Sequence, residues 1–296
     1  MALPQPCPQE RVAGAASASV CSTVSGPSRP ATVLHAGHDA VYLDLDGACL
    51  GVVSSRGVHV PCGVRTRRPR LPLLRPGDGA TVGEGSIRLP GLEVEVTEIV
   101  DTTVGVLGPD AVGRAAHLLR EAVGDRLAGA LAELPEEPMR RLAECDASAV
   151  AGLLGFGSGL TPLGDDVLAG WLAVGAATRH PALASIRTAV GLSARQRTTT
   201  LSATLLACAA RGEGVPQFRR LLEGLAVGDA DLVEQSADDV LDIGDTSGSG
   251  LVLGALTALD TLDALTALEA LDVPDVLDAL EPPPPPPSPS RQGASR

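Results

Sequence analysis

The scarcity of aromatic side chains limits how this chain can fold more than any other feature. Among its 296 residues are one tryptophan, one tyrosine and two phenylalanines: Trp171, Tyr42, Phe156 and Phe218. Because aromatic rings contribute much of the area buried in most cores, this core has to be filled by Ala, Val and Leu instead. We therefore expect its helices to pack closely, through small residues that let neighbouring backbones approach. Base-stacking platforms for nucleic acid are excluded on the same ground.

The charged residues disfavour several kinds of binding partner and exclude several catalytic mechanisms. The formal net charge is -13, and all 23 basic residues are arginine. The acidic excess disfavours nucleic acid and anionic membranes as partners. The absence of lysine excludes a Schiff-base, Walker-type or kinase-type lysine. A bound phosphate or carboxylate would have to be held by arginine, backbone N–H groups or a metal.

The cysteines and the N-terminal residues indicate the compartment. The six cysteines are scattered and form no C-x-x-C pair, so neither a zinc knuckle nor a redox motif is visible. Glu10 and Arg11 interrupt the apolar character near the N-terminus, which argues against a signal peptide. No run of about 18 uninterrupted apolar residues follows. We expect a cytoplasmic protein that binds neither nucleic acid nor membrane.

The period of the apolar residues changes from two to helical near Gly108-Pro109-Asp110. Before this point the chain consists of short β-branched runs separated by Gly and Pro, which are typical of strands. These runs are Thr32 to Leu34, Ala40 to Leu45, Leu50 to Val53, Val58 to Val60, Ser86 to Leu89, Leu92 to Val100 and Thr103 to Leu107. The pattern predicts an α+β fold, with a small N-terminal β-rich domain followed by a mainly α-helical domain.

The same pattern predicts the domain limits. We expect residues 1–30 to be a partly disordered extension with a short helix near 11–24, and residues 31–108 to form the β-rich domain. Residues 109–281 form the helical domain with the Gly-rich motifs, and residues 282–296 a disordered proline-rich tail. Expected helices span 111–134, 137–154 and 162–178, with others opening near 195–202 and 243–250. Between Leu253 and Leu271 a leucine recurs every three residues, which an α-helix cannot keep on one face, so the later half should be partly exposed or self-associating.

Residues Gly155–Asp166 combine a glycine loop, a helix start and two adjacent carboxylates. The alternating glycines allow positive φ and close approach of a ligand to the backbone. Thr161 and Pro162 predict the N-cap and first residue of a helix. Asp165 and Asp166 are about 100° apart on that helix, so if one orients a ligand the other should reinforce the loop or a metal-bound water. The alternative is a tight loop before a well-capped helix, whose aspartates only complement its dipole.

Two further stretches repeat this design: Arg195–Ser202 and Ile243–Gly250. Three helix N-termini rich in Gly, Ser and Thr exceed what capping needs, so we expect them to converge on one anion-binding pocket. The candidate catalytic residues are Asp165 and Asp166. The candidate substrate-binding residues are Gly155, Gly157, Ser158, Gly159, Thr161, Arg195, Arg197, Thr199, Thr200, Ser202, Gly244, Asp245, Thr246, Ser247 and Gly248.

Two other features invite functional interpretations. His35 and His38 are three residues apart, and on a strand such side chains point to opposite faces, so we expect no metal site there. We expect no cofactor elsewhere in the chain. The basic run Arg65, Arg67, Arg68, Arg70 and Arg75 is interleaved with prolines, so it should be extended and solvated, and able to meet an acidic partner.

The string GFGSGLTPLGDDVLAG, which begins at Gly155, resembles the signature of a bacterial family whose named member is AllH, a subunit of oxamate carbamoyltransferase. Thr199–Ser202 with Ala209–Gly212, and Gly244–Gly248, are similar to the family's second and third blocks in the same order. The resemblance covers most of residues 11–260. It implies a small anionic substrate, FdrA-like and AllG-like partner subunits, and the handling of oxamate or oxalurate and carbamoyl phosphate in purine nitrogen catabolism.

This chain departs from the family pattern in two places. The family usually has proline at Ser158 and serine at Leu163, and these changes keep the glycines and both aspartates. It also has a histidine at or near Asp245 and an aspartate just past Ser249, where this chain has Gly250. The second pair of departures removes a possible acid or base.

Two functions fit these features. The first is a carbamoyltransferase subunit that is active only with its partners, in which Asp165 or Asp166 orients the amide nitrogen and Arg195 or Arg197 pairs with the anion. Such chemistry needs little beyond positioning and charge stabilisation. The alternative is a non-catalytic regulatory or assembly subunit of an FdrA-like complex, which the absence of a compact nucleophile–base pair favours.

Overall fold

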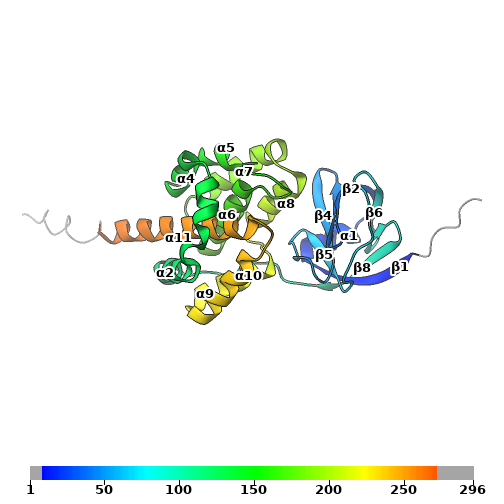
Figure 1. Ribbon diagram of the computed structural model, residues 1–296, viewed down its shortest axis with the longest axis horizontal. Coiled ribbons are helices and arrows are strands. Elements are labelled where there is room, and N and C mark those ends of the chain that lie inside the picture. Colours follow the sequence, from blue (N-terminus) through cyan, green and yellow to red (C-terminus); the bar gives the residue numbers. More distant parts are fainter. Residues whose placement is uncertain (1–8, 272–296) are drawn as a thin grey trace, which may run out of the picture.

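The computed structural model describes residues 9–271, and the side chains of residues 9–267. The predicted proline-rich tail, residues 282–296, lies outside the described residues. A β-barrel forms one end of the elongated molecule and a helical part the other, with helix α8 close to the barrel (Figure 1). Residues 100–108 connect the last strand to the first helical turn.

Eight strands close into the barrel in the order β1-β5-β4-β3-β2-β6-β7-β8. The pairs β1–β8 and β4–β5 are parallel, and the other neighbours are antiparallel. Closure leaves no unpaired sheet edge. The strands are β1 (Glu10–Ala16), β2 (Arg29–Ala36), β3 (Ala40–Leu45), β4 (Ala48–Val53), β5 (Gly63–Thr66), β6 (Gly79–Gly83), β7 (Ser86–Leu89) and β8 (Leu92–Ile99).

The closed barrel corrects the predicted fold class. An α+β protein with a small β-rich domain is wrong as stated, because residues 10–99 form a closed eight-stranded barrel, followed by a helical region. The barrel includes residues that the sequence assigned to an N-terminal extension: strand β1 and helix α1 (Ala18–Ser25). Helix α1 packs against β6, β7 and β8, and its Val20 and Val24 join the barrel core.

The sequence pattern missed three strands, β1, β5 and β6, and predicted two strands that do not form. β1 is rich in Ala and Gly, so its alternation is hard to see, and β5 lies at the start of the arginine run. β6 is short and begins and ends with glycine. Val58–Val60 and Thr103–Leu107 form no strand in the structure, and of the latter only Thr103 makes a bridge, with Glu213.

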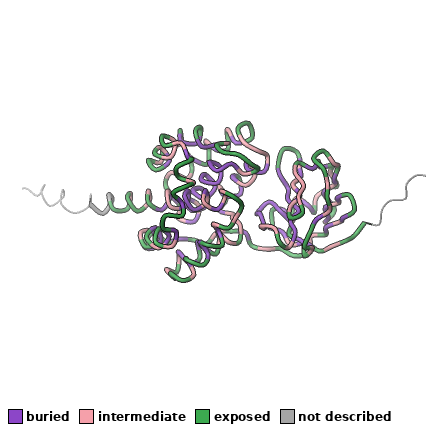
Figure 2. The backbone as a smooth tube through the Cα atoms, in the orientation of Figure 1, coloured by how far each residue is buried: buried purple, intermediate pink, exposed green. Residues whose placement is uncertain are grey.

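The helical part contains ten α-helices and two 3-10 turns within the described residues. They are η1 (Pro109–Ala111), α2 (Val112–Val123), η2 (Gly124–Leu127), α3 (Ala128–Glu133), α4 (Glu136–Ala143), α5 (Ala149–Leu153), α6 (Leu163–Thr178), α7 (Leu183–Arg197), α8 (Thr200–Ala209), α9 (Pro216–Val227), α10 (Ala230–Leu241) and α11 (Ser247–Leu271). Buried residues are concentrated along α6 and inside the barrel (Figure 2).

Helices α6 and α11 cross closely, as the shortage of aromatic residues predicts. A Cβ at Gly170 would lie 2.0 Å from the carbonyl oxygen of Leu251, and one at Gly254 would lie 1.9 Å from that of Val167. No Cβ fits at such distances, so the two backbones touch only because both positions are glycine. The prediction that small residues on the central helix allow a neighbouring backbone to approach is confirmed.

Helix α11 changes environment along its length. Its first turns are buried in the helical core, with Val252, Ala255, Ala258 and Leu259 fully enclosed, whereas residues 260–267 are exposed or half-buried. The prediction of a partly exposed later half is therefore confirmed. Ser247–Ala267 is long and apolar enough to cross a membrane, but 44% of its most apolar stretch is buried inside the protein.

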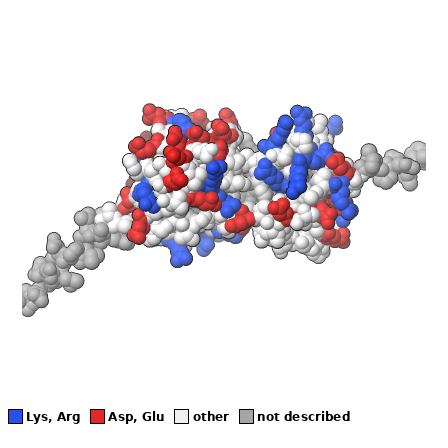
Figure 3. Space-filling view, turned by 90° about the horizontal axis from the view of Figure 1, so that it is seen from below, with Lys and Arg blue, Asp and Glu red and all other residues white. Residues whose placement is uncertain are grey.

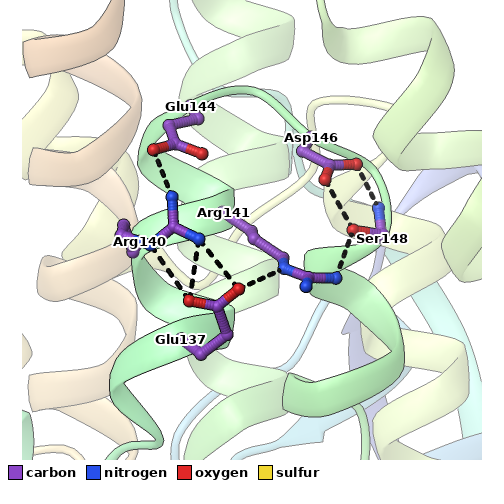
Figure 4. Close-up of polar contacts among 6 residues, drawn as sticks. All are labelled: Glu137, Arg140, Arg141, Glu144, Asp146 and Ser148. Atoms are coloured by element: carbon purple, nitrogen blue, oxygen red, sulfur yellow. Dashed lines mark hydrogen bonds and ion pairs between the residues drawn. The ribbon is translucent and has the colours of Figure 1, made fainter.

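Ion pairs link charged side chains on the surface at the turn between α4 and α5 (Figure 4). Arg140 donates to Glu137 at 2.8 Å and to Glu144 at 2.5 Å, and Arg141 donates to the same Glu137 at 2.8 Å. The turn closes where Asp146 accepts from the hydroxyl of Ser148 at 2.6 Å. All these groups face solvent, where such pairs contribute little to stability.

The charges are unevenly distributed over the surface. On the face shown in Figure 3, arginines gather over the barrel and acidic side chains are more numerous over the helical part. Within the basic run, Arg65 donates to the carbonyl of Ser55 at 2.8 Å and Arg68 pairs with Glu10.

A separate apolar cluster joins the barrel to the helices. Cys49, Cys62 and Val60 from the barrel contact Leu201 and Cys208 of α8. The amide of Cys49 also donates to the hydroxyl of Thr204 at 2.9 Å. Helix α8 is therefore the element through which the helical part rests on strand β4.

Candidate functional site

The glycine loop before α6 adopts the predicted left-handed backbone. Gly155, Gly157 and Gly159 have φ values of 76°, 110° and 90°. At Gly155 a Cβ would also lie 2.2 Å from the carbonyl oxygen of Arg197, so the loop touches the end of α7 directly. The prediction of positive φ at these glycines is confirmed.

The predicted cap of α6 is wrong. The helix begins at Leu163, Pro162 occupies the N-cap, and no side chain caps it. The hydroxyl of Thr161 instead lies 2.8 Å from that of Ser247, across 86 residues of sequence. Thr161 was expected to cap the helix that follows it. In the structure its side chain instead contacts the start of α11, which is distant in sequence.

Asp165 joins the first motif block to the second. It is 1% exposed and accepts hydrogen bonds from the amide of Gly155 at 2.7 Å, the hydroxyl of Ser202 at 2.7 Å and the hydroxyl of Thr198. Three donors compensate for the burial of this carboxylate. Asp165 therefore reinforces the loop, the role expected of one aspartate if the other orients a ligand, and the ligand contact of Asp166 stays a prediction.

Asp166 lies in different surroundings although it is the next residue. It is 7% exposed, and its buried Oδ2 has no hydrogen-bond partner within the described residues. Burial raises the pKa of Asp166 to about 8, the charge of Asp165 adds to the rise, and the hydroxyls of Ser247 and Thr161 oppose it. A carboxyl group with this pKa exchanges its proton close to neutral pH.

Asp166 lines a cavity of about 310 Å³ between the barrel and the helices, which we call the acidic cavity. Thr161 and Ser247 line the same wall, and Leu201 and Leu205 of α8 form another. All three motif blocks therefore border one cavity, but the second block does so only through apolar side chains such as Leu201, and none of its candidate binding residues lines the cavity. The apolar part of its lining comes mainly from Ala, Leu and Val side chains, with Phe218.

The charge of the acidic cavity differs from what an anion pocket needs. Its lining includes the carboxylates of Asp39, Asp166 and Glu213, and none of its described lining residues is an arginine. Glu213 is paired with Arg211 at 2.9 Å, and Asp39 accepts from the hydroxyl of Ser54 at 2.9 Å. Among the described lining residues, Asp166 has a buried side-chain oxygen without a hydrogen-bond partner.

The two candidate arginines lie away from this cavity. Arg195 lines a different cavity, on the other side of α8. Arg197 is exposed and donates to the carbonyl of Ala151 at 2.7 Å.

The structure assigns the other candidate residues to several roles. Gly157, Ser158 and Gly159 are exposed on the loop. Thr199 is the N-cap of α8, accepting from the amide of Ser202 at 3.0 Å and donating to the carbonyl of Leu160 at 2.6 Å. Thr200 accepts on its carbonyl from Thr204.

In the third block, Gly244 lines the acidic cavity with Ser247, and Asp245 is exposed. Thr246 accepts on its carbonyl from the amide of Gly250 at 2.9 Å. Gly248 is buried, and a Cβ there would lie 2.0 Å from the carbonyl oxygen of Val240. Gly250 is equally constrained, because a Cβ at this position would lie 2.6 Å from the Cβ of Asp166. The departure at Gly250 therefore fits the packing around Asp166.

The barrel contributes residues to the cavity that sequence reasoning missed. Asp39 comes from the turn between β2 and β3, Tyr42 from β3, and Val58 and Val60 from the segment after β4. Burial raises the pKa of Tyr42, and its ring lies 6.3 Å from that of His35. None of these residues belongs to a motif block. The one signal in the sequence was that Tyr42 is the single tyrosine of the chain.

Comparison with known proteins matches part of the helical region and not the barrel. No curated protein and no solved structure matches the chain. Residues 153–259 match the family model described as oxamate carbamoyltransferase subunit AllH, and this segment contains all three motif blocks and excludes the barrel. The resemblance on which the three blocks were assigned is thus confirmed: over residues 153–259 this chain matches the oxamate carbamoyltransferase subunit AllH.

Proposed function

We propose that this chain is the subunit of an oxamate carbamoyltransferase that holds the amide end of the acceptor, with Asp166 as the group that contacts it. One observation carries the proposal: Asp166 lines a cavity bordered by all three motif blocks, and its buried Oδ2 has no hydrogen-bond partner within the described residues. An unpaired buried carboxyl oxygen costs free energy unless a ligand satisfies it. This oxygen can accept a hydrogen bond from an amide N–H of the substrate.

The pKa of Asp166 suits proton transfer as well as binding. A general base works best when its pKa lies near the operating pH, and that of Asp166 is about 8. In its ionised form Asp166 takes a proton from the acceptor amide while the nitrogen attacks the carbamoyl carbon. The new N–C bond forms, the C–O bond to phosphate breaks, and the proton ends on Oδ2. Asp165, already saturated by three donors, positions the loop and does not touch the substrate.

The acidic cavity suits only part of this reaction. Oxamate carries a carboxylate and carbamoyl phosphate is a dianion, yet no arginine stands among the described residues that line the cavity. We propose that a partner chain supplies the cationic groups, so that the active site is completed on assembly. FdrA-like and AllG-like subunits are the proposed partners, and purine nitrogen catabolism is the proposed pathway.

The same observation supports a second candidate function. If partners hold the whole substrate, the acidic cavity serves assembly or regulation, as in a non-catalytic subunit of an FdrA-like complex. Its largely apolar lining and its position between barrel and helices favour this alternative.

Reconstitution separates the two candidates. Carbamoyl transfer to oxamate is measured for the chain mixed with its FdrA-like and AllG-like partners, as wild type, Asp166→Asn and Asp242→Asn. Asp242 is an exposed aspartate at the end of α10 and serves as the matched control. Loss of a general base should lower kcat about 100-fold or more in Asp166→Asn, with assembly unchanged. Full activity with Asp166→Asn would contradict the proposal, and normal chemistry with weakened assembly would favour the alternative.

A further inference from the structure

The side of α8 facing away from the acidic cavity borders a second cavity, of about 520 Å³, which we call the arginine cleft. Its walls come from α1, the β3–β4 hairpin, α7 and α8. Leu201 and Leu205 of α8 face the acidic cavity, whereas Thr204 and Leu206 face the arginine cleft. One helix therefore separates two cavities, and both lie between the barrel and the helical part.

The charge of the arginine cleft is opposite to that of the acidic cavity. Arg187, Arg195 and Arg211 line it, and no Asp or Glu stands among its described lining residues. Arg211 is paired with Glu213 at 2.9 Å. Arg187 and Arg195 make no ion pair and no side-chain hydrogen bond with any residue in the range 9–267. The cleft therefore presents two guanidinium groups with no ionic partner among the described residues, in a protein of net charge -13.

The two free arginines face the cleft together. They are eight residues apart on α7, and Val190, Gly191 and Ala194, which lie between them at helical spacing, line the same cavity. The guanidinium of Arg195 reaches the β3–β4 turn, where its Nη1 would lie 3.5 Å from a Cβ at Gly47. Arg195 thus extends from the helical part across the cleft to the barrel.

The rest of the cleft is apolar. Val20, Leu45 and Leu50 line the barrel side, and Val190 and Leu206 line the helical side. A guanidinium group binds carboxylate and phosphate oxygens through paired, charge-assisted hydrogen bonds. A cavity of this volume with aliphatic walls is of the size that encloses small organic ligands.

We propose that the arginine cleft is a second ligand site, for an organic anion whose carboxylate or phosphate pairs with Arg187 and Arg195 and whose apolar body lies on the aliphatic walls. This site is separate from the one at Asp166, and the proposed transferase function does not require it. A ligand in the cleft contacts both the barrel and α8.

The test uses isothermal titration calorimetry on the full chain with three probes: octanoate, hexyl phosphate and octan-1-ol. Either anion should bind about ten-fold or more tightly than the alcohol, because the charge-assisted bonds are lost with the neutral probe. The preferred anion distinguishes a carboxylate ligand from a phosphate ligand. Equal binding of the alcohol and of both anions would overturn the proposal.

Variants locate the site. Arg187→Met and Arg195→Met should each raise the Kd of the preferred anion about ten-fold, while the exposed barrel residue Arg67, which lies outside the cleft, gives a neutral control as Arg67→Met. Asp166→Asn should leave anion binding unchanged, which separates this inference from the proposed function. Wild-type affinity in both cleft variants, or loss of binding in Asp166→Asn alone, would contradict the assignment. If a cleft variant misfolds, the wild type still decides, since added salt should weaken binding of the anion and not of the alcohol.

Discussion

The acidic cavity and the arginine cleft lie on opposite sides of the same helix, yet they are built from different kinds of sequence. The acidic cavity is bordered by the three motif blocks, with Asp166 unpaired on its wall. The arginine cleft is lined by residues of α1, the β3–β4 hairpin and α7, which apart from Arg195 belong to no motif, and by α8 and the turn after it, where Ala210 and Arg211 belong to the second block. The comparison teaches that the motif blocks specify a close-packed polar junction, and that the positive charge expected beside them lies across α8.

The largest effect should come from disturbing the helix crossing that supports the acidic cavity. In Gly254→Ala the new Cβ would lie 1.9 Å from the carbonyl oxygen of Val167, and backbone cannot move aside as a side chain can. We expect a loss of about 3 kcal/mol or more of unfolding free energy in urea. Gly129→Ala is the matched control, because a Cβ at Gly129 meets nothing within 4 Å and should be neutral or stabilising. Equal stability of the two variants would show that α6 and α11 do not cross as described.

Removing the buried charge of Asp165 should have the next largest effect. Asp165→Asn replaces a carboxylate that accepts three hydrogen bonds with an amide that brings unwanted donors. We expect about 3 kcal/mol of destabilisation, measured by urea unfolding at pH 7. Because Asp165 links Gly155 to Ser202, hydrogen exchange should also quicken at the Gly155 amide. An unchanged exchange rate there would contradict the role of Asp165 in holding the loop.

The adjacent Asp166 should respond in the opposite direction. Its folded pKa of about 8 exceeds the unfolded value near 3.9, so the folded state holds a proton that the unfolded state releases. The contribution of Asp166 to the free energy of unfolding is fully present below about pH 4 and is lost as the pH rises to about 8. Asp166→Asn removes the dependence, so relative to wild type it should gain about 3 kcal/mol between pH 5 and pH 8. Parallel stability curves for the two proteins across this range would show that Asp166 ionises normally.

The contact between the first and third blocks should matter less. Thr161→Val removes one side of the 2.8 Å contact with the Ser247 hydroxyl and leaves that hydroxyl without its partner. We expect a loss of about 1 kcal/mol in urea unfolding. Ser247→Ala should cost a similar amount, and the double variant should cost less than the two single changes added together. Full additivity would show that the two hydroxyls do not interact.

The sequence predicted the parts of this comparison that depend on local backbone. Positive φ at Gly155, Gly157 and Gly159, the close approach along α6 and the loop role of one aspartate followed from residue types and spacing. The closed barrel did not, because closure depends on β1 pairing with both β5 and β8 across more than 40 residues. The sequence also placed Thr161 at a helix cap, since its partner Ser247 is distant in the chain. The barrel residues of the acidic cavity, such as Asp39 and Tyr42, could not be found from any motif.

The charge of the acidic cavity was the least predictable feature. Because Arg195 and Arg197 lie next to a motif block in the sequence, we expected them to line the same cavity and to pair with the bound anion. Both lie near the C-terminal end of α7, one facing the arginine cleft and the other the Ala151 carbonyl. A rotation of about 200° separates residues two apart on a helix, so sequence proximity alone did not determine which side of α8 each would face.

The measurement that tests the central claim most directly is the titration of Asp166 itself. In protein labelled with ¹³C at the aspartate side-chain carboxyl groups, NMR spectra recorded across the pH range assign Asp166 by the signal that disappears in Asp166→Asn. The structure predicts a midpoint near pH 8, because the carboxyl group is buried and its Oδ2 has no partner within the described residues. A midpoint near the ordinary aspartate value of about 4 would show that water or a donor satisfies this oxygen, and the acidic cavity would lose its candidate catalytic group.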